Sequence, residues 1–296
     1  MSHEQHPEPG ERSDRTMVTT ADEVVSTFKV TPAARRKYDR WCVDESRARV
    51  VELVGNHATV ELYRLTLDDV RQVCNKTSHA LVNVSRENAE RVPAARDWYP
   101  RFAFTHLMHY YLEQRKELPT WQKISEFFFH SDEGMDLIGG DTRRLVAQAA
   151  RDGVSERLVD DALQWRFGNA YYSFLREVFT VVTLRSRGFD VRVHPLADAL
   201  FRVDGWMGDT VISLWVANED FRQDKGLEPT GRKERACDLL AEAQPPFSYL
   251  NIELDKAAKW GRVHLPSAGK LTRAAATLAN PRNQAAPTTA GNDHLT

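Results

Sequence analysis

The sequence predicts an α+β protein, with a mostly helical N-terminal domain followed by an α/β domain around a central mixed sheet. Up to Gly188, apolar residues recur at the spacing of helices, and after it they alternate with polar residues as in strands. The segments after Gly188 follow the order three strands, helix, strand, which is an α/β layer arrangement. We place the two domains at 24–156 and 157–280.

The composition indicates a globular protein of two modest domains in a reducing compartment. The chain has 296 residues, of which 42% are hydrophobic and 28% are charged. No apolar run approaches the roughly 20 residues that cross a bilayer, and MSHEQHPEPGERSDR at the start has no apolar segment. We therefore expect no secretory signal and no membrane partner. Three widely separated cysteines argue against a disulfide framework and favour a cytoplasmic location.

Both ends of the chain are expected to be disordered because polar residues, proline and glycine dominate there. We predict an acidic disordered tail over 1–23 and a second tail over 281–296. The formal net charge is −2, yet residues 256–292 hold six bases and no acid. Such a segment attracts phosphate through counterion release, although a solvated tail has the same composition.

The N-terminal domain is expected to consist of helices with one short strand. The pattern predicts a helix around 33–54, a strand at 58–63 and a helix that Thr66 caps. Residues 98–131 are rich in aromatic side chains, which usually form core because they bury large apolar areas.

Residues 119–153 have the pattern of a helix-turn-helix. Asp141 is expected to cap the second helix after a Gly139-Gly140 break, with Arg143 and Arg144 in its first turn. The first turn of a recognition helix is where DNA is contacted, so these two arginines are candidate nucleic-acid ligands. Any two successive amphipathic helices give a similar pattern, and the loop is long for the motif.

Three residues of the aromatic-rich segment have metal-ligand spacing. His106, His109 and Glu113 share one helix face at i, i+3 and i+7. No fourth ligand and no cysteine pair accompanies them, so the pattern favours core or surface histidines over a metal site.

The C-terminal domain is expected to begin with two helices, the second of which is apolar on so many sides that it lies across a sheet. Alternating residues then predict three strands, a helix and two further strands. In order, the expected elements are helices 156–168 and 169–187, strands 189–194, 198–203 and 210–217, helix 231–242, and strands 247–254 and 262–265.

Residues 169–265 resemble the restriction-endonuclease-like, or PD-(D/E)XK, superfamily. In that family a helix glutamate precedes an aspartate at the start of the second strand, and here these positions hold Glu177 and Asp198. The family's third strand carries Glu-x-Lys, and here Ser213 and Trp215 stand in its place. Serine is a poor ligand for a hard cation and tryptophan offers only an N–H donor, so neither replaces the family residue.

The resemblance implies a Mg²⁺ site with Asp198 as a ligand and Glu177 as a further catalytic acid. Asp204 is expected on the same strand face as Asp198 and is a spare metal ligand. Mg²⁺ binds through one or two carboxylates plus water, so two acids over one sheet face suit it. The alternative is that the acids are paired with nearby bases. Asp198 would pair with His194 or Arg202, and Glu177 with Arg192 or Arg185.

A second candidate site lies after the third strand. Arg232 and Lys233 are expected in the first turn of helix 231–242, where free backbone N–H groups attract anions, and Arg222 precedes them. Nucleic-acid phosphate is the expected ligand. An exposed loop of mixed charge is the alternative reading.

The leading functional hypothesis is a DNA-associated protein with a nuclease-like C-terminal domain, in DNA processing, mobile-element or defence function. If active, it is a Mg²⁺-dependent phosphodiester hydrolase acting on DNA or RNA, with a protein partner that completes the site. The alternatives are a non-catalytic nucleic-acid-binding or regulatory protein on the same fold, and a small-molecule-binding protein. Phosphate-loop, G-x-S-x-G and HExxH motifs are absent from the sequence.

Overall fold

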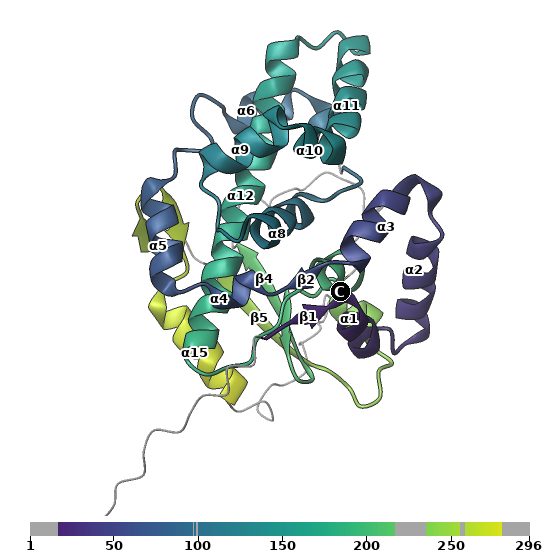
Figure 1. The fold of residues 1–296 in the computed structure, drawn as a ribbon, viewed down its shortest axis with the longest axis vertical. Coiled ribbons are helices and arrows are strands. Elements are labelled where there is room, and N and C mark those ends of the chain that lie inside the picture. Colours follow the sequence, from purple (N-terminus) through teal and green to yellow (C-terminus); the bar gives the residue numbers. More distant parts are fainter. Residues whose placement is uncertain (1–16, 97, 99, 217–234, 255–257, 280–296) are drawn as a thin grey trace, which may run out of the picture.

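The computed structural model of the protein describes residues 17–96, 98, 100–216, 235–254 and 258–279. Helices dominate and the strands form small sheets, in agreement with the predicted α+β class. The long helix α12 (Glu156–Ser186) runs through the middle of the molecule, with short helices around one end and the largest sheet near the other (Figure 1). None of the helices in these ranges combines the length and apolar character needed to cross a bilayer.

Short helices and one two-stranded ribbon precede α12. Strands β1 (Thr19–Thr20) and β2 (Ala58–Thr59) pair antiparallel. The helices are α1 (Ala21–Phe28), α2 (Pro32–Cys42), the 3₁₀ turn η1 (Glu45–Arg47), α3 (Ala48–Gly55), α4 (Glu61–Arg64), α5 (Leu67–Lys76), α6 (Arg86–Glu90), α7 (Pro93–Arg96), α8 (Phe104–Arg115), α9 (Trp121–His130), α10 (Asp132–Gly134), the π-helix η2 (Met135–Gly139) and α11 (Gly140–Arg151).

Threonine caps fix the starts of several of these helices. The side-chain oxygen of the cap accepts a hydrogen bond from a backbone N–H that the first turn leaves free. Thr66 caps α5 as predicted, and Asp69 completes a capping box by accepting the Thr66 N–H. The other threonine caps are Thr20 on α1, Thr31 on α2 and Thr120 on α9.

Two predicted elements of this region differ from the structure. The predicted helix 33–54 is two helices, α2 and α3, because Asp44 accepts the Ser46 N–H and starts the turn η1 between them. The predicted strand 58–63 ends at Thr59, because the backbone turns into α4 two residues later.

The predicted acidic tail 1–23 extends too far into the chain. Residues 19–20 form β1, and Thr19 Oγ1 lies 2.8 Å from the Tyr63 hydroxyl. The helix α1 begins at Ala21, because Val24 and Phe28 are spaced to enter the core and are both fully buried. Residues 1–16 and the predicted tail 281–296 lie outside the described residues.

The segment 119–153 forms α9, α10, η2 and α11, with the last three joined without a break. Gly139 and Gly140 have ordinary right-handed helical backbone angles and continue the helix instead of breaking it. The turn that separates α9 from α10 is at Ser131, whose side chain caps α10. The two helices of the predicted helix-turn-helix are therefore present, but the break lies earlier than the sequence suggested.

The predicted helices 156–168 and 169–187 are one continuous helix of 31 residues, α12. Gly168 does not interrupt it. A side chain there would lie 2.7 Å from Leu81 Cδ2 and 3.1 Å from the Ala80 carbonyl oxygen, so glycine allows the preceding loop to approach the helix closely. The predicted burial of this helix on several sides is confirmed, since Phe174, Leu175 and Val178 are all fully buried.

The largest sheet has three strands in the order β3 (Gly205–Met207), β4 (Thr210–Val216) and β5 (Ser248–Leu254). Strand β4 is antiparallel to β3 and parallel to β5, so the sheet is mixed, as predicted. The predicted strands 210–217 and 247–254 are confirmed within one residue. The predicted strand 189–194 is reduced to a single bridge between Arg192 and Trp206.

The predicted strand 198–203 is wrong, because Ala197–Phe201 is a π-helix, η3. His194 starts the turn by accepting the Leu196 N–H at its Nδ1 atom, and Arg202 ends it with a left-handed backbone (φ 59°). Residues Ala197, Leu200 and Phe201 are buried, which satisfies the apolar pattern through a helical turn instead of a strand face.

The remaining elements are a short helix, a hairpin and a final helix. Of the predicted helix 231–242, only α14 (Ala236–Leu239) is observed, and residues 231–234 lie outside the described residues. Strands β6 (Ala258–Trp260) and β7 (Val263–Leu265) form an antiparallel hairpin, which confirms the predicted strand near 262–265. Helix α15 (Ala268–Ala279) follows.

One hydrophobic core connects both halves of the chain. It contains buried residues from Val24 in α1, through α8 and α12, to Leu278 in α15. A smaller core joins α6, α7 and α11 to the first turns of α12. The proposed boundary at residue 156 therefore falls at the start of a helix whose later turns belong to the main core.

Candidate active site

Helix α8 brings two histidines into the centre of the protein. His106 and His109 lie one turn apart, and their exposed fractions are 4% and 3%. Their neighbours Leu107 and Met108 are fully buried as well. Because almost no face of α8 is left to solvent at this turn, the aromatic-rich segment packs as core, and it encloses two titratable side chains.

His109 is paired with one of the acids that the sequence selected. Its Nε2 atom lies 3.1 Å from Oε1 of Glu177, which projects from α12. Burial alone would lower the pKa of His109, but the hydrogen bond and the charge of Glu177 outweigh it and raise the pKa above 6.5. The charges of Glu113 and Asp198 act in the same direction. His109 is therefore held as a cation more firmly than a free histidine.

His106 has the opposite electrostatic environment. Burial lowers its pKa to about 4, although the charge of Asp198 opposes the shift. Neither ring nitrogen makes a well-formed hydrogen bond, and the Pro195 carbonyl only offsets the shift in part. A neutral imidazole with an unpaired nitrogen is a proton acceptor, so the pKa values of the two histidines, one turn apart on α8, are shifted in opposite directions.

Asp198, the second selected acid, reaches α8 from η3. Its Oδ2 atom accepts a hydrogen bond of 3.1 Å from Thr105 Oγ1, one residue before His106. The structure therefore brings Glu177 and Asp198, which are 21 positions apart in sequence, to the same turn of α8.

Two further histidines complete what we call the histidine cluster, which consists of His57, His106, His109 and His194. The ring of His57 makes edge-on contacts with His194 and His109, at centroid distances of 5.1 and 6.3 Å. The His194 Nε2 atom donates to the His57 carbonyl, while its Nδ1 atom accepts the Leu196 N–H. Burial lowers the pKa of His194 to about 4 and that of His57 well below 6.5.

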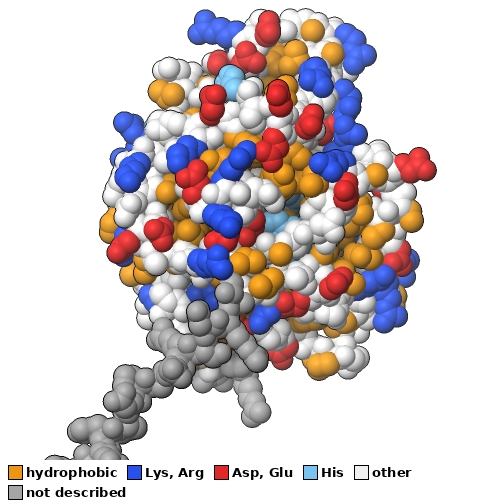
Figure 2. Space-filling model, in the orientation of Figure 1, with side chains coloured by type: hydrophobic (Ala, Val, Ile, Leu, Met, Phe, Trp, Pro, Cys, Tyr) orange, Lys and Arg blue, Asp and Glu red, His pale blue; other side chains and the backbone are white. Residues whose placement is uncertain are grey.

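The cluster is reached from one face of the molecule. Figure 2 shows histidine atoms at the bottom of a hollow in the middle of this face, where Figure 1 places α8 and β2. Acidic and hydrophobic side chains border the hollow. The Glu177 side chain is 16% exposed, so this carboxylate remains partly open to solvent.

Glu113 has a structural role. Its carboxylate accepts three backbone N–H groups at the start of α4, from Val60, Glu61 and Leu62, at 2.8 to 3.2 Å. A carboxylate at a helix N-terminus accepts hydrogen bonds from free backbone N–H groups and interacts favourably with the positive end of the helix dipole. His106, His109 and Glu113 lie on one helix, as their i, i+3, i+7 spacing predicts. Because Glu113 binds the N-terminus of α4, the three do not form a set of metal ligands.

Asp204, the third selected acid, is bonded to strand β4. Its Oδ2 atom accepts the Leu214 N–H at 2.6 Å, across the antiparallel pair of β3 and β4. Continuing the register of that pair places Asp204 opposite Ser213. The acid thus stands beside the third-strand position where the resembling family has glutamate.

The predicted nucleic-acid ligands have separate positions. Arg144 is ion-paired with the buried Asp141, which also accepts the Arg101 backbone N–H at 2.7 Å. Arg143 is exposed in the first turn of α11. Arg222, Arg232 and Lys233 lie outside the described residues.

The described side chains do not fit a Mg²⁺ centre. Each selected acid already has a different hydrogen-bond partner, and the nearby extra donors are imidazole nitrogens, whereas Mg²⁺ prefers oxygen. Within the described ranges, no three histidine, cysteine, aspartate or glutamate side chains are arranged to hold a metal ion.

Sequence reasoning missed His57, and it considered His194 only as a possible ion-pair partner of Asp198. The two histidines come from different loops, and only the pairing of β1 with β2 and the turn before η3 bring them to α8. His194 follows an apolar segment and precedes Pro195, and such a position gives no sign of a cluster.

No protein-family model, curated protein or solved structure matches this chain. The class of the protein is therefore inferred from its own geometry. That geometry is a mixed α/β fold with a largely buried histidine cluster and two carboxylates that meet it.

Proposed function

We propose that the protein is a hydrolase that cleaves phosphodiester bonds of nucleic acid by acid–base catalysis at the histidine cluster. One observation carries the proposal: Glu177 and Asp198, the acids selected by the resemblance to nucleases, meet two histidines of opposite pKa shift on one turn of α8. Titratable groups whose pKa values are pushed apart are typical of paired general acids and bases.

The proposed roles follow from the protonation states. Neutral His106 takes a proton from water, whose oxygen attacks phosphorus. The bond between phosphorus and the leaving oxygen then breaks, and protonated His109 gives its proton to that oxygen. Glu177 holds His109 in place and favours its cationic form, and Thr105 orients Asp198 beside His106.

The accessible shape favours a single strand as substrate. Because the rings of His106 and His109 are almost wholly buried, the reacting group has to enter the hollow. A single strand or a flipped nucleotide brings its backbone closer to a recessed site. We therefore expect cleavage of single-stranded nucleic acid in preference to duplex.

Cleavage of a labelled single-stranded oligonucleotide tests the proposal. We expect His109→Gln to lower kcat by about 10² to 10⁴, the usual range for removal of a general acid, whereas His130→Gln should leave it unchanged. His130 is the matched control because it is exposed at the end of α9. Full activity of His109→Gln would remove His109 from the mechanism.

Two further conditions of the cleavage assay test whether a metal ion is required and whether Asp198 contributes. The resemblance implies Mg²⁺, so cleavage is measured with and without EDTA. Asp198→Asn keeps the size of the side chain and removes its charge, and we expect it to reduce cleavage strongly. Loss of wild-type cleavage in EDTA would replace the histidine mechanism with a metal-dependent one.

A second candidate function is nucleic-acid binding without cleavage. The pairing of Asp204 with the β4 backbone beside Ser213 favours it, because a hydroxyl stands where the resembling family has a carboxylate. Measurable binding by the pure wild-type protein with no cleavage under any metal condition would support this candidate.

A further inference from the structure

Helix α2 carries a local excess of positive charge. Its sequence PAARRKYDRWC has four basic residues and one acid, although the whole chain has a net charge of −2. The acid, Asp39, is already bonded to Lys29 at 2.6 Å. The helix therefore presents cations that its own carboxylate does not neutralise.

Arg36 and Arg40 lack the carboxylate partner that several other arginines of the described ranges have. Elsewhere an arginine commonly has a carboxylate three or four residues away, and the described examples include Arg47 with Asp44, Arg49 with Glu52, Arg64 with Glu61, Arg71 with Asp68 and Arg86 with Glu90. Arg36 and Arg40 are both exposed, and they have no ion pair or hydrogen bond with any residue of the described ranges. Their charge is thus available to an external anion.

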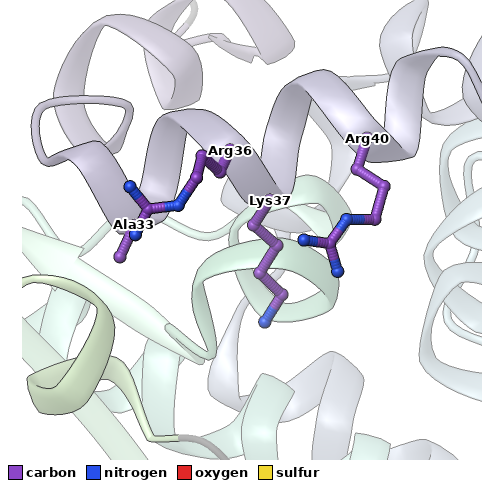
Figure 3. Close-up of a pocket in the computed structure, with 4 residues that line it drawn as sticks. All are labelled: Ala33, Arg36, Lys37 and Arg40. Atoms are coloured by element: carbon purple, nitrogen blue, oxygen red, sulfur yellow. The ribbon is translucent and has the colours of Figure 1, made fainter.

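These side chains line one depression. Ala33, Arg36, Lys37 and Arg40 lie along it, and its volume is about 230 Å³. Figure 3 shows Lys37 and Arg40 extending to the same side of the helix, with Arg36 running toward Ala33. The depression is open and lies along the helix axis, which suits an extended ligand better than a single enclosed ion.

The position of α2 relates this depression to the candidate active site. Helix α2 packs against η3, the element that carries Asp198. Thr31 caps the N-terminus of α2. Its hydroxyl donates a hydrogen bond of 2.6 Å to the Leu239 carbonyl, which fixes this end of the helix against α14. A ligand on α2 would therefore lie beside the element that leads to the histidine cluster.

We infer that α2 binds the phosphate backbone of a single-stranded nucleic acid. This inference rests on the proposed function for its substrate class. Guanidinium groups match phosphate geometry through paired N–H donors, and two of them on successive turns suit a repeating anion. Backbone contacts of this kind position the strand without reading its sequence.

A membrane surface is the competing polyanion, and α2 fits it less well. Helices that lie on lipid keep large apolar side chains exposed beside their cations. In α2 the tryptophan, Trp41, is 8% exposed and Ala34 is fully buried, so these apolar residues face the core. Nucleic acid therefore agrees better with the side chains present.

Binding of a labelled single-stranded oligonucleotide over a range of salt concentrations tests the inference. The double variant Arg36→Ala, Arg40→Ala should bind about tenfold more weakly or worse, and its slope of log K against log salt should fall by about 1.4. The control variant Arg47→Ala, Arg49→Ala removes the same charge from exposed arginines that already have carboxylate partners. It should keep the wild-type affinity and slope.

The outcomes separate this inference from the proposed catalysis. The Arg36, Arg40 variant should raise the KM for the oligonucleotide, whereas His109→Gln should lower kcat. Wild-type protein that binds but does not cleave would overturn the catalysis and leave the α2 surface standing. Equal losses in the control variant, no wild-type binding at all, or binding to anionic phospholipid vesicles in place of the oligonucleotide would overturn the α2 surface.

Discussion

The Nε2 atom of His109 and the Oε1 atom of Glu177 lie 3.1 Å apart and join α8 to α12 inside the protein. The histidine side chain is 3% exposed and that of the glutamate 16%, so solvent screens this pair little. The contact reverses the effect of burial on His109, because burial alone would lower the pKa of the ring. It is also the most direct link between an acid selected from the sequence and the histidine cluster.

Removing the charge of Glu177 should therefore reverse the pKa shift of His109. In Glu177→Gln the ring stays buried but loses its anionic partner, so its pKa should fall from above 6.5 to below 6.5. Titration of the histidine ring signals by NMR measures this directly. The exposed pair of Arg115 and Glu133 supplies the control, Glu133→Gln, which should leave the His109 titration unchanged. An unaltered His109 pKa in Glu177→Gln would contradict the assigned role.

Acid should destabilise the protein through the neutral histidines. His106 and His194 have a pKa of about 4 when folded and about 6.5 when unfolded, so between these values the unfolded chain binds more protons. Their contribution is fully present above pH 6.5 and is lost as the pH falls toward 4, by about 3 kcal/mol for each ring. His109 acts in the opposite direction, because its raised pKa stabilises the fold at low pH. Urea unfolding from pH 7.5 to pH 4 measures the sum.

The variant His106→Leu isolates one ring from that sum. A leucine fills a similar volume, and both ring nitrogens of His106 are buried without a well-formed hydrogen bond, so stability at pH 7.5 should change little. The loss of stability between pH 6.5 and pH 4 should shrink by about 3 kcal/mol. A pH dependence identical to that of the wild type would show that folding does not shift the pKa of His106.

The sequence predicted the elements whose signals are local. Thr66 followed by two acids marked the start of α5, and alternating residues marked β4 and β5. The strand 198–203 was mispredicted because Ala199, Phe201 and Val203 alternate, while the hydrogen bond from Leu196 N–H to His194 starts a helical turn before them. Period-two spacing over so few residues fits a buried turn as well as a strand.

The candidate site was predictable only in part, because local sequence patterns do not record contacts between residues far apart in the chain. Glu177 and Asp198 were selected because a family pattern fixes their order along the chain. Their actual partners, His109 and Thr105, lie some 68 and 93 positions earlier in the sequence, and no local pattern records such a contact. His57 is brought to the cluster by the two-residue strand β2, which is too short to be recognised from alternation.

The hairpin of β6 and β7 docks onto α5 through a glycine, and this contact makes a prediction about stability. Gly261 has a φ of +53°, and a side chain at this position would lie 2.3 Å from the Cys74 carbonyl oxygen. Gly208, in the turn between β3 and β4, has nearly the same φ of +57° but nothing within 4 Å of where its side chain would be. Both Gly→Ala variants acquire the strain of a left-handed backbone, about 1 kcal/mol, because alanine disfavours it.

Only Gly261→Ala also forces the hairpin away from the end of α5. That movement weakens the stacking of Arg71 over the Trp260 ring, now at 4.6 Å, and the burial of Val263. We expect Gly261→Ala to lower the free energy of unfolding by about 3 kcal/mol or more, and Gly208→Ala by about 1 kcal/mol. Urea unfolding of the two variants at pH 7.5 compares them directly. Equal losses would mean that the hairpin turn does not rest on the Cys74 carbonyl, since backbone strain is the same at both positions.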